Sequence, residues 1–179
     1  LPPIPEANEV NAPTTSTTMM LALGDAIAVS LIDAKKFNAS NFGVFHPGGK
    51  LGSKFLKVSE LMRKDKDLPL VDENQRMSEV LVEMTSKHLG CAGVLNETNK
   101  LIGIITDGDL RRHISNNFLE NSAKEVMTKD PKTIFDNMLA VEAIAIMNKN
   151  RITNMFVVNE ENKAIGILHL QDCLKVGVV

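Results

Sequence analysis

The chain has 179 residues, of which 44% are hydrophobic, so it can bury a substantial core in one domain or in two small ones. Its 20 basic and 22 acidic residues nearly balance, which excludes a general electrostatic attraction to nucleic acid or to anionic lipid. Tryptophan and tyrosine are absent, which argues against base-stacking platforms for single-stranded nucleic acid.

Nothing in the composition points to a membrane or a secreted protein. No apolar run approaches the roughly 20 residues that span a bilayer, and the first residues lack the regions of a signal peptide. Cys91 and Cys173 stand in apolar surroundings without a CxxC partner, which is typical of reduced thiols in a cytoplasmic protein. A chain that begins at Leu1 is expected to be a piece of a longer protein.

The front of the chain predicts one long helix. Residues 1–13 carry four of the seven prolines and are expected to be extended. The side chains of Thr14, Thr15 and Ser16 are candidate helix caps, because each can accept a hydrogen bond from a first-turn N–H. Apolar residues at three- and four-residue spacing up to about residue 36 then predict a long, mostly buried helix.

A glycine-rich segment follows this helix. Residues 43–52 hold four glycines and a proline, which precludes regular structure and lets the backbone approach a ligand closely. His46 stands directly before the turn Pro47-Gly48-Gly49, so a loop presents its imidazole. It is either a surface histidine or a catalytic one, and the residues alone favour the first interpretation. The histidines at 46, 88, 113 and 169 lack ligand spacing, so no metal site is expected.

From Val58 onward the chain consists of two copies of one pattern. Residues 77–109 align without gaps on residues 140–172, with eleven identities in 33 pairs. Each copy predicts a helical turn ending in methionine, a short extended segment, a helix, two strands joined by an asparagine-containing hairpin turn, and a closing helix. The strands are expected at 91–95, 101–106, 155–158 and 164–168, and the closing helices at 107–114 and 170–176. Each copy is therefore a β-α-β-β-α unit with two helices on one face of a small sheet.

The end of each copy carries a short box of residues that the two copies share in part. The first reads Gly-Ile-Ile-Thr-Asp-Gly-Asp-Leu over residues 103–110, and the second keeps glycine and aspartate but has His169 for threonine and Cys173 for leucine. This pattern resembles a tandem pair of CBS domains, complete in the first copy. The resemblance implies an α+β or α/β fold in which two units form a flat two-fold disc, whose central cleft often holds an adenosyl or other nucleotide.

The same resemblance indicates effector-binding residues. A threonine hydroxyl and an aspartate at a helix start can bond ribose hydroxyls, and first-turn N–H groups favour phosphate. Thr106, Asp107, Asp109 and Asp172 are therefore the candidates, chiefly in the first copy. The alternative is that the acids only stabilise helix starts, and that the pair is an empty spacer or dimerisation unit.

With the preceding fifty residues included, the chain resembles the C-terminal part of bacterial arabinose-5-phosphate isomerases. The resemblance rests on the Thr14 to Thr18 cluster, Gly24-Asp25-Ala26 and the loop around His46. It implies an upstream sugar isomerase (SIS) domain, an α/β sandwich whose remnant and linker form residues 1–54. CBS domains would then span 55–118 and 119–179. The implied reaction interconverts D-ribulose 5-phosphate and D-arabinose 5-phosphate for Kdo in lipopolysaccharide or capsule.

This second resemblance also assigns roles in the front segment. His46 resembles an active-site histidine that completes a neighbouring subunit's site in the tetramer, and histidine suits ring opening or proton transfer near neutral pH. Thr14, Thr15 and Ser16 resemble residues at the edge of that site. The remaining catalytic groups would lie upstream of Leu1, so this chain alone is expected to be inactive.

Two functional hypotheses for the repeat pair stay open. In the first, it regulates the isomerase by binding a nucleotide or a nucleotide sugar such as CMP-Kdo, with no cofactor required. In the second, it is a ligand-free module that dimerises through residues such as Ile114, Phe118 and Leu119. Both imply a cytoplasmic homo-oligomer, with a dimer through the CBS pair and a tetramer in the intact enzyme, and neither involves nucleic acid or membrane. A CBS protein that regulates something unrelated is the third and weaker interpretation.

Overall fold

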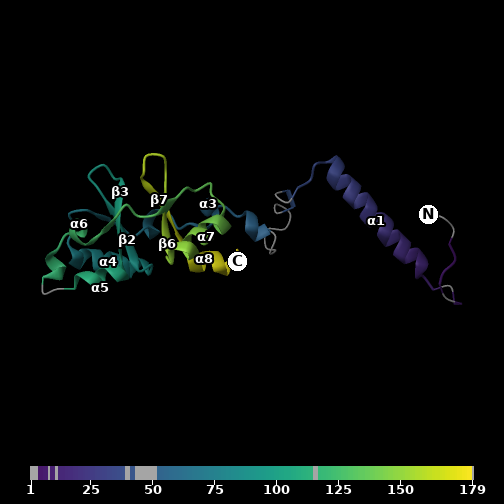
Figure 1. The fold of residues 1–179 in the computed structure, drawn as a ribbon, viewed down its shortest axis with the longest axis horizontal. Coiled ribbons are helices and arrows are strands. Elements are labelled where there is room, and N and C mark those ends of the chain that lie inside the picture. The colour runs from purple at the N-terminus through teal and green to yellow at the C-terminus, as the bar shows by residue number, and fades with distance from the viewer. Residues whose placement is uncertain are drawn as a thin grey trace. The chain divides into compact units, whose positions relative to one another are not determined.

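The computed structural model describes residues 4–7, 9–10, 12–38, 41–42, 52–114 and 117–178. The chain divides into two compact units, Leu1–Pro47 and Gly48–Val179 (Figure 1). The first unit contains the long helix, and the second contains both repeats.

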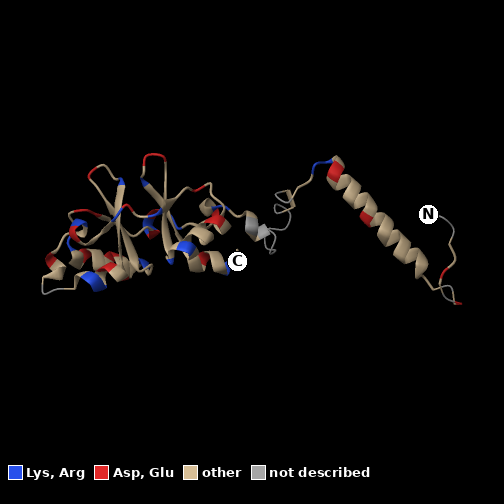
Figure 2. Cartoon of the chain, in the orientation of Figure 1, with Lys and Arg blue, Asp and Glu red and all other residues tan. Residues whose placement is uncertain are grey.

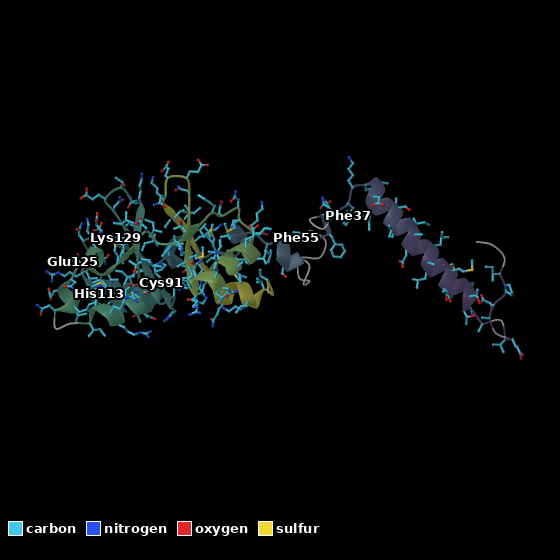
Figure 3. All side chains as sticks on the ribbon, in the orientation of Figure 1. Phe37, Phe55, Cys91, His113, Glu125 and Lys129 are labelled. Carbon is cyan, nitrogen blue, oxygen red and sulfur yellow. The ribbon has the colours of Figure 1, made fainter. Side chains whose placement is uncertain are left out.

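The helix of the first unit, α1, spans Thr15–Ala34 and contains no buried residue. This overturns the prediction of a mostly buried helix, because no other described element of that unit packs against it. Its apolar side chains project outward, as Figure 3 shows, and Leu21 is 69% exposed. Asp25 and Asp33 are its only charged residues, which leaves most of its surface uncharged (Figure 2).

By length and composition α1 is also long and apolar enough to cross a membrane, and it is the one such helix in the described part of the chain. The expectation that no apolar run approaches the roughly 20 residues that span a bilayer therefore does not hold for this segment. Core helices of soluble proteins pass the same test, so the finding by itself assigns no membrane.

The start of α1 is capped from a distance. Glu6 Oε2 accepts hydrogen bonds from the backbone N–H of Thr14 at 2.8 Å, of Thr15 at 2.8 Å and of Ser16 at 3.4 Å. Thr14 occupies the N-cap position, but its side chain makes no capping bond. The prediction that a hydroxyl of Thr14, Thr15 or Ser16 caps the helix is therefore wrong. A carboxylate that folds back eight residues along the chain satisfies several N–H groups at once, which one hydroxyl does not.

The second unit contains two small sheets of matching topology. The first has strand order β1-β2-β3-β4, formed by β1 (Leu70–Asp72), β2 (Cys91–Leu95), β3 (Leu101–Thr106) and β4 (Thr128–Lys129). The second has order β5-β6-β7, formed by β5 (Thr133–Ile134), β6 (Asn154–Val158) and β7 (Ala164–His169). In each sheet the first strand runs parallel to the second and the second runs antiparallel to the third.

Each sheet carries two helices along one side, in agreement with the predicted β-α-β-β-α unit. They are α4 (Met77–Lys87) and α5 (Asp107–His113) in the first repeat, and α7 (Ala140–Asn150) and α8 (Leu170–Lys175) in the second (Figure 1). The short turns are η1 (Gly52–Phe55), α3 (Val58–Leu61), η2 (Asp65–Asp67), η3 (Phe118–Glu120) and α6 (Ala123–Val126). Both hairpin turns form as expected, since the side-chain oxygens of Asn96 and Asn159 accept equivalent backbone bonds.

The opening segment of each repeat packs on the other repeat. Val58 of α3 lies in one core with Ile134 and Leu168 of the second repeat. Conversely, Val126 of α6 lies in the core of the first repeat with Ile105. The internal sequence alignment predicted the two repeats, but it did not predict that their opening segments pack on each other's cores.

Two glycines make the exchange sterically feasible. A Cβ at Gly103 would collide with the side chain of Met127, and a Cβ at Gly166 would collide with that of Met62. Each methionine turn therefore lies directly on a strand of the repeat that it packs against. This contact explains why both the methionine and the glycine occur in each copy.

A third core joins the repeats. It contains Leu89, Cys91, Leu101, Phe156, Val158 and Ile167, of which Phe156 is the largest fully buried side chain. Backbone and side-chain bonds add to this core, since Leu101 N–H donates to the Asn162 carbonyl at 2.9 Å and Asn162 Nδ2 donates to the Leu101 carbonyl at 2.9 Å. The two repeats therefore form one packed body.

Candidate functional site

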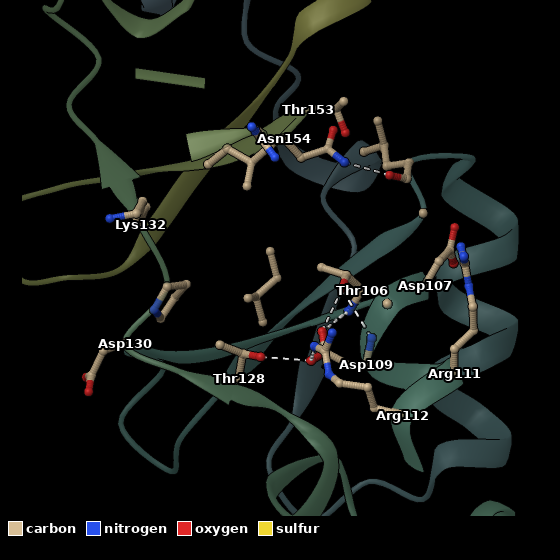
Figure 4. Close-up of a pocket in the computed structure, with 17 residues that line it drawn as sticks. Thr106, Asp107, Asp109, Arg111, Arg112, Thr128, Asp130, Lys132, Thr153 and Asn154 are labelled. Atoms are coloured by element: carbon tan, nitrogen blue, oxygen red, sulfur yellow. Dashed lines mark hydrogen bonds and ion pairs between the residues drawn. The ribbon is translucent and has the colours of Figure 1, made fainter. Parts of the chain in front are cut away.

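A cleft of about 700 Å³ opens between the repeats, a size typical of small-molecule sites (Figure 4). Four segments line it: residues 89–90, the junction of β3 and α5, residues 128–132, and residues 151–154. Three of the predicted effector residues, Thr106, Asp107 and Asp109, lie in this wall. The last two segments were missed by sequence reasoning, because only the packing of one repeat on the other brings them to the box.

Thr106 and Asp109 form a reciprocal cap at the start of α5. The Thr106 N–H and hydroxyl donate to Asp109 Oδ2 at 2.8 Å and 2.6 Å, and the Asp109 N–H donates to Thr106 Oγ1 at 3.4 Å. Such a capping box satisfies first-turn N–H groups that helical bonding leaves open. The box sequence is thus explained locally without a ligand.

The other oxygen of Asp109 is also occupied. Oδ1 accepts from the Thr128 hydroxyl at 2.8 Å and from the Arg112 guanidinium, while the residue is only 2% exposed. Burial raises the pKa of Asp109, but the bonds from Thr106, Thr128 and Arg112 outweigh it and hold the pKa below its usual range. Asp109 is therefore an ionised, fully bonded part of the cleft wall.

Asp107 occupies a different position at the same junction. Its carboxylate lies close to Gly90, where an added Cβ would be 3.0 Å from Asp107 Oδ2. Gly90 has a φ of +63°, a conformation that suits glycine, and its carbonyl accepts the Asp107 N–H at 3.3 Å. Asp107 is exposed, in contrast to Asp109.

The cleft has more basic than acidic side chains. Arg111, Arg112, Lys132 and Arg151 line it together with Asp107, Asp109 and Asp130. Of the four bases, Arg112 is ion-paired with Asp109, whereas no ion pair forms at the other three within the described residues. The arrangement favours a ligand that carries an anionic group.

One wall residue has an unsatisfied polar atom. Asn154 Nδ2 donates to the Leu89 carbonyl at 2.8 Å, but Asn154 Oδ1 is buried without a partner. It is the one buried side-chain oxygen or nitrogen in this state within the part of the chain that the structure describes. Asn154 therefore holds the first repeat to the second at the edge of the cleft.

The second box lies in a different setting. His169 caps α8, because its Nδ1 accepts the Gln171 N–H at 3.1 Å. It thus replaces the threonine of the first box as the capping side chain. Asp172 pairs with Arg63 Nε at 2.8 Å and with Lys175 Nζ at 3.3 Å. Burial raises the pKa of Asp172, but Arg63 and Lys175 together hold it below its usual value. Asp172 is not among the residues that line the 700 Å³ cleft.

The remaining predicted residues belong to the front of the chain. Thr14, Thr15 and Ser16 lie at the start of α1, where their N–H groups bond Glu6. His46 lies outside the described residues. Among the residues that are described, no three histidine, cysteine, aspartate or glutamate side chains cluster as metal ligands would. Cys91 and Cys173 are buried core thiols, and burial raises their pKa values to about 12 and about 11.

Comparison with known proteins places these features in a family. The CBS domain family matches residues 58–116 and 123–178. The chain is 42% identical over 171 residues to arabinose 5-phosphate isomerase KdsD of Pseudomonas aeruginosa, covering 94% of this chain and 52% of the relative. The chain thus spans about half the length of this relative.

Solved structures show the same fold at low sequence identity. CBSX2 in complex with AMP aligns with a TM-score of 0.59 at 20% identity, over 68% of this chain and 96% of that chain. The CBS domain pair of MJ0100, in complex with 5'-methylthioadenosine and S-adenosyl-L-methionine, aligns with a TM-score of 0.61 at 20% identity, over 68% and 95%.

Proposed function

Because the chain belongs to the CBS domain family, we propose that its two repeats are the regulatory region of a larger isomerase and bind a nucleotide effector in the 700 Å³ cleft. The observation that carries this proposal is the cleft itself, with a basic excess in its wall. CBS proteins of the same fold bind AMP, 5'-methylthioadenosine and S-adenosylmethionine.

The parent protein, in this proposal, interconverts D-ribulose 5-phosphate and D-arabinose 5-phosphate. Support comes from the 42% identity to an arabinose 5-phosphate isomerase that is about twice as long. Residues 1–54 would be the end of a SIS domain and a linker, with CBS domains at 55–118 and 119–179. The exposed apolar surface of α1 supports this assignment, because a catalytic domain would cover it.

The catalytic assignments follow from the same proposal. His46 would act in a neighbouring subunit's site in a cytoplasmic tetramer, and Thr14, Thr15 and Ser16 would border that site. The chain alone would be inactive, since the phosphate grip and further acid–base groups belong to the upstream domain. Turnover by this chain at a rate near that of the longer enzyme would refute the assignment.

The effector is proposed to be CMP-Kdo or an adenine nucleotide, as the phosphate of either fits the basic side chains of the cleft. Thr106 and Asp107 would contact it directly. Asp109 would bind the effector only if the ligand displaces Arg112 or Thr128, because both of its carboxylate oxygens already accept hydrogen bonds. Asp172 would contribute only if its pair with Arg63 opens.

A titration of the chain with AMP, ATP and CMP-Kdo tests the effector. Lys132→Glu reverses a charge inside the cleft, and Lys149→Glu makes the same change on the exposed surface of α7. We expect one of the nucleotides to raise the melting temperature of the wild type and of Lys149→Glu, and Lys132→Glu to weaken its binding at least tenfold. If no nucleotide binds the wild type, the regulatory proposal is wrong.

That negative result would favour a ligand-free dimerisation module. Ile114 and Leu119 support it, since they are 73% and 51% exposed. Phe118, which the sequence analysis also placed on this surface, is instead buried in the core of the first repeat beside Val126. A dimer that persists without nucleotide and dissociates in Ile114→Asp would establish the module.

A further inference from the structure

The two repeats place different residues at one equivalent position. Ile104 and Ile167, like Asp109 and Asp172, are related by the constant offset of 63 positions. Thr128 pairs with Ile104 across β3 and β4, and Arg63 forms the corresponding bridge to Ile167. Arg63 is therefore the structural counterpart of Thr128.

Both residues bond the aspartate of the box beside them, but they differ in size. The Thr128 hydroxyl bonds Asp109 at 2.8 Å and leaves the adjoining cleft open. At the counterpart, the Arg63 Nε bonds Asp172 at 2.8 Å, so a much longer side chain lies beside the aspartate of the second box. Ile104 is partly exposed in the wall of the cleft, whereas Ile167 is 0% exposed.

The segment behind Arg63 is also longer than its counterpart. Seven residues separate Met62 from β1, whereas five separate Met127 from β5. The longer segment forms the turn η2 at Asp65–Asp67, and its Lys66 carbonyl accepts a bond from Lys87 Nζ. Leu68, at its end, packs against the core that contains Ile167. Arg63 and the end of this segment thus both lie against the part of the second repeat that contains Ile167.

We propose that Arg63, backed by residues 64–68, closes a latent second nucleotide site beside His169 and Asp172. The pair of repeats is then a sensor with one open cleft for each chain, although the fold provides two equivalent places. This inference rests on the proposed function for its ligand class. Its structural part, the closure by Arg63, is independent of any ligand.

Arg63→Thr tests the closure, because it installs the residue that the first repeat has at position 128. The first readout needs no ligand: carbethoxylation of His169 by diethyl pyrocarbonate near neutral pH, mapped by mass spectrometry. Burial lowers the pKa of His169, and the charge of the nearby Arg63 guanidinium lowers it further, so the two side chains are close. We expect several-fold faster modification of His169 in Arg63→Thr than in the wild type.

The matched control is Arg76→Thr, which removes an arginine from an exposed ion pair with Glu120. It should leave the rate at His169 unchanged. Arg63→Ala serves if the threonine variant does not fold, since alanine also removes both the long side chain and its bond to Asp172. An unchanged His169 rate in a folded Arg63 variant would overturn the proposal.

The second readout is the binding stoichiometry of AMP, and of ATP in a parallel series, by equilibrium dialysis. We expect one equivalent for the wild type, two for Arg63→Thr and none for Thr128→Arg, which places an arginine in the open cleft. Faster modification of His169 without a second equivalent would show a cavity that is not a ligand site, and would overturn the proposal. If the wild type binds neither probe, the proposed function fails, while the His169 rate still decides the closure.

Discussion

Asn154 of the second repeat donates a hydrogen bond to the carbonyl oxygen of Leu89 in the first repeat at 2.8 Å, while its own Oδ1 is buried without a partner. Asn154→Ala leaves the Leu89 carbonyl unbonded but also removes the unsatisfied oxygen, so it should lower the free energy of unfolding by only about 1 kcal/mol. Asn154→Asp places an acceptor or a negative charge opposite the Leu89 carbonyl oxygen. It should therefore lower the free energy of unfolding by about 3 kcal/mol. Urea denaturation of both variants measures the two losses of stability. An aspartate variant as stable as the alanine variant would contradict the prediction.

Asp109 should contribute to stability independently of any ligand. Asp109→Ala removes the acceptor for Thr106, Thr128 and Arg112 and should lower the free energy of unfolding by about 2–3 kcal/mol, because hydrogen bonds to a buried charged group are worth about 1.5–3 kcal/mol. The matched change Asp107→Ala concerns an exposed carboxylate in the same turn and should cost less than about 1 kcal/mol. Equal losses in ligand-free denaturation would show that the capping network is unimportant.

His169 predicts a pH dependence of stability. Burial lowers its pKa below the ordinary value of 6.5, and in the neutral form its Nδ1 accepts the Gln171 N–H. The folded state therefore binds fewer protons than the unfolded state just below pH 6.5. The contribution of neutral His169 to the free energy of unfolding is therefore fully present above pH 6.5. It is lost as the pH falls through the pKa that His169 has in the folded state. His169→Thr should remove this part of the pH profile of the melting temperature; an unchanged profile would assign it to other groups.

Glu6 should control the first turn of α1. Hydrogen bonds from Ser16 and Thr14 lower its pKa to about 2, so its stabilising effect is present above the ordinary value of 4.5 and is lost as the pH falls toward about 2. Glu6→Gln should accelerate amide hydrogen exchange at Thr15 and Ser16 near neutral pH. Glu9→Gln is the control, and exchange that responds equally to both changes would argue against the cap.

A side chain at Gly93 should be destabilising because it would collide with the ring of Phe156, and a smaller residue at position 156 should relieve this collision. A Cβ there would lie 2.7 Å from Phe156 Cζ and 2.9 Å from Leu101 Cδ1, so Gly93→Ala should cost about 1–3 kcal/mol by overpacking. In Phe156→Leu the ring is gone, and the same alanine should cost less. A double-mutant cycle measures the difference, and strict additivity would show that the ring is not the obstacle.

Local patterns were sufficient to predict most elements of the second unit. The strands at 91–95 and 101–106 have the predicted bounds, and both closing helices end within one residue of the prediction. These elements follow from alternating or helical hydrophobicity and from asparagine-containing turns, which act over a few residues. The residues of the first box were likewise found, because their chemistry belongs to one helix start.

Features that depend on distant contacts were not predictable in this way. Nothing in the local sequence around Glu6 indicates that its carboxylate folds back on the start of α1. No local pattern indicates a role for Arg63, and only the bridge to Ile167 shows that it faces Asp172. The hydrogen bonding of Asp109 likewise depends on a distant residue. Its Oδ1 accepts from Thr128, which belongs to the segment that opens the second repeat.

The exchange of opening segments has a consequence for synthesis on the ribosome. Val58 and Met62 emerge more than 100 residues before Leu168 and Gly166, on which they pack. The early segment must therefore wait, with its apolar side chains exposed, until nearly the whole unit has been translated. Such non-local pairing slows folding and leaves a period in which aggregation competes. The two halves should consequently melt in a single transition, and a chain ending near residue 118 should not fold independently.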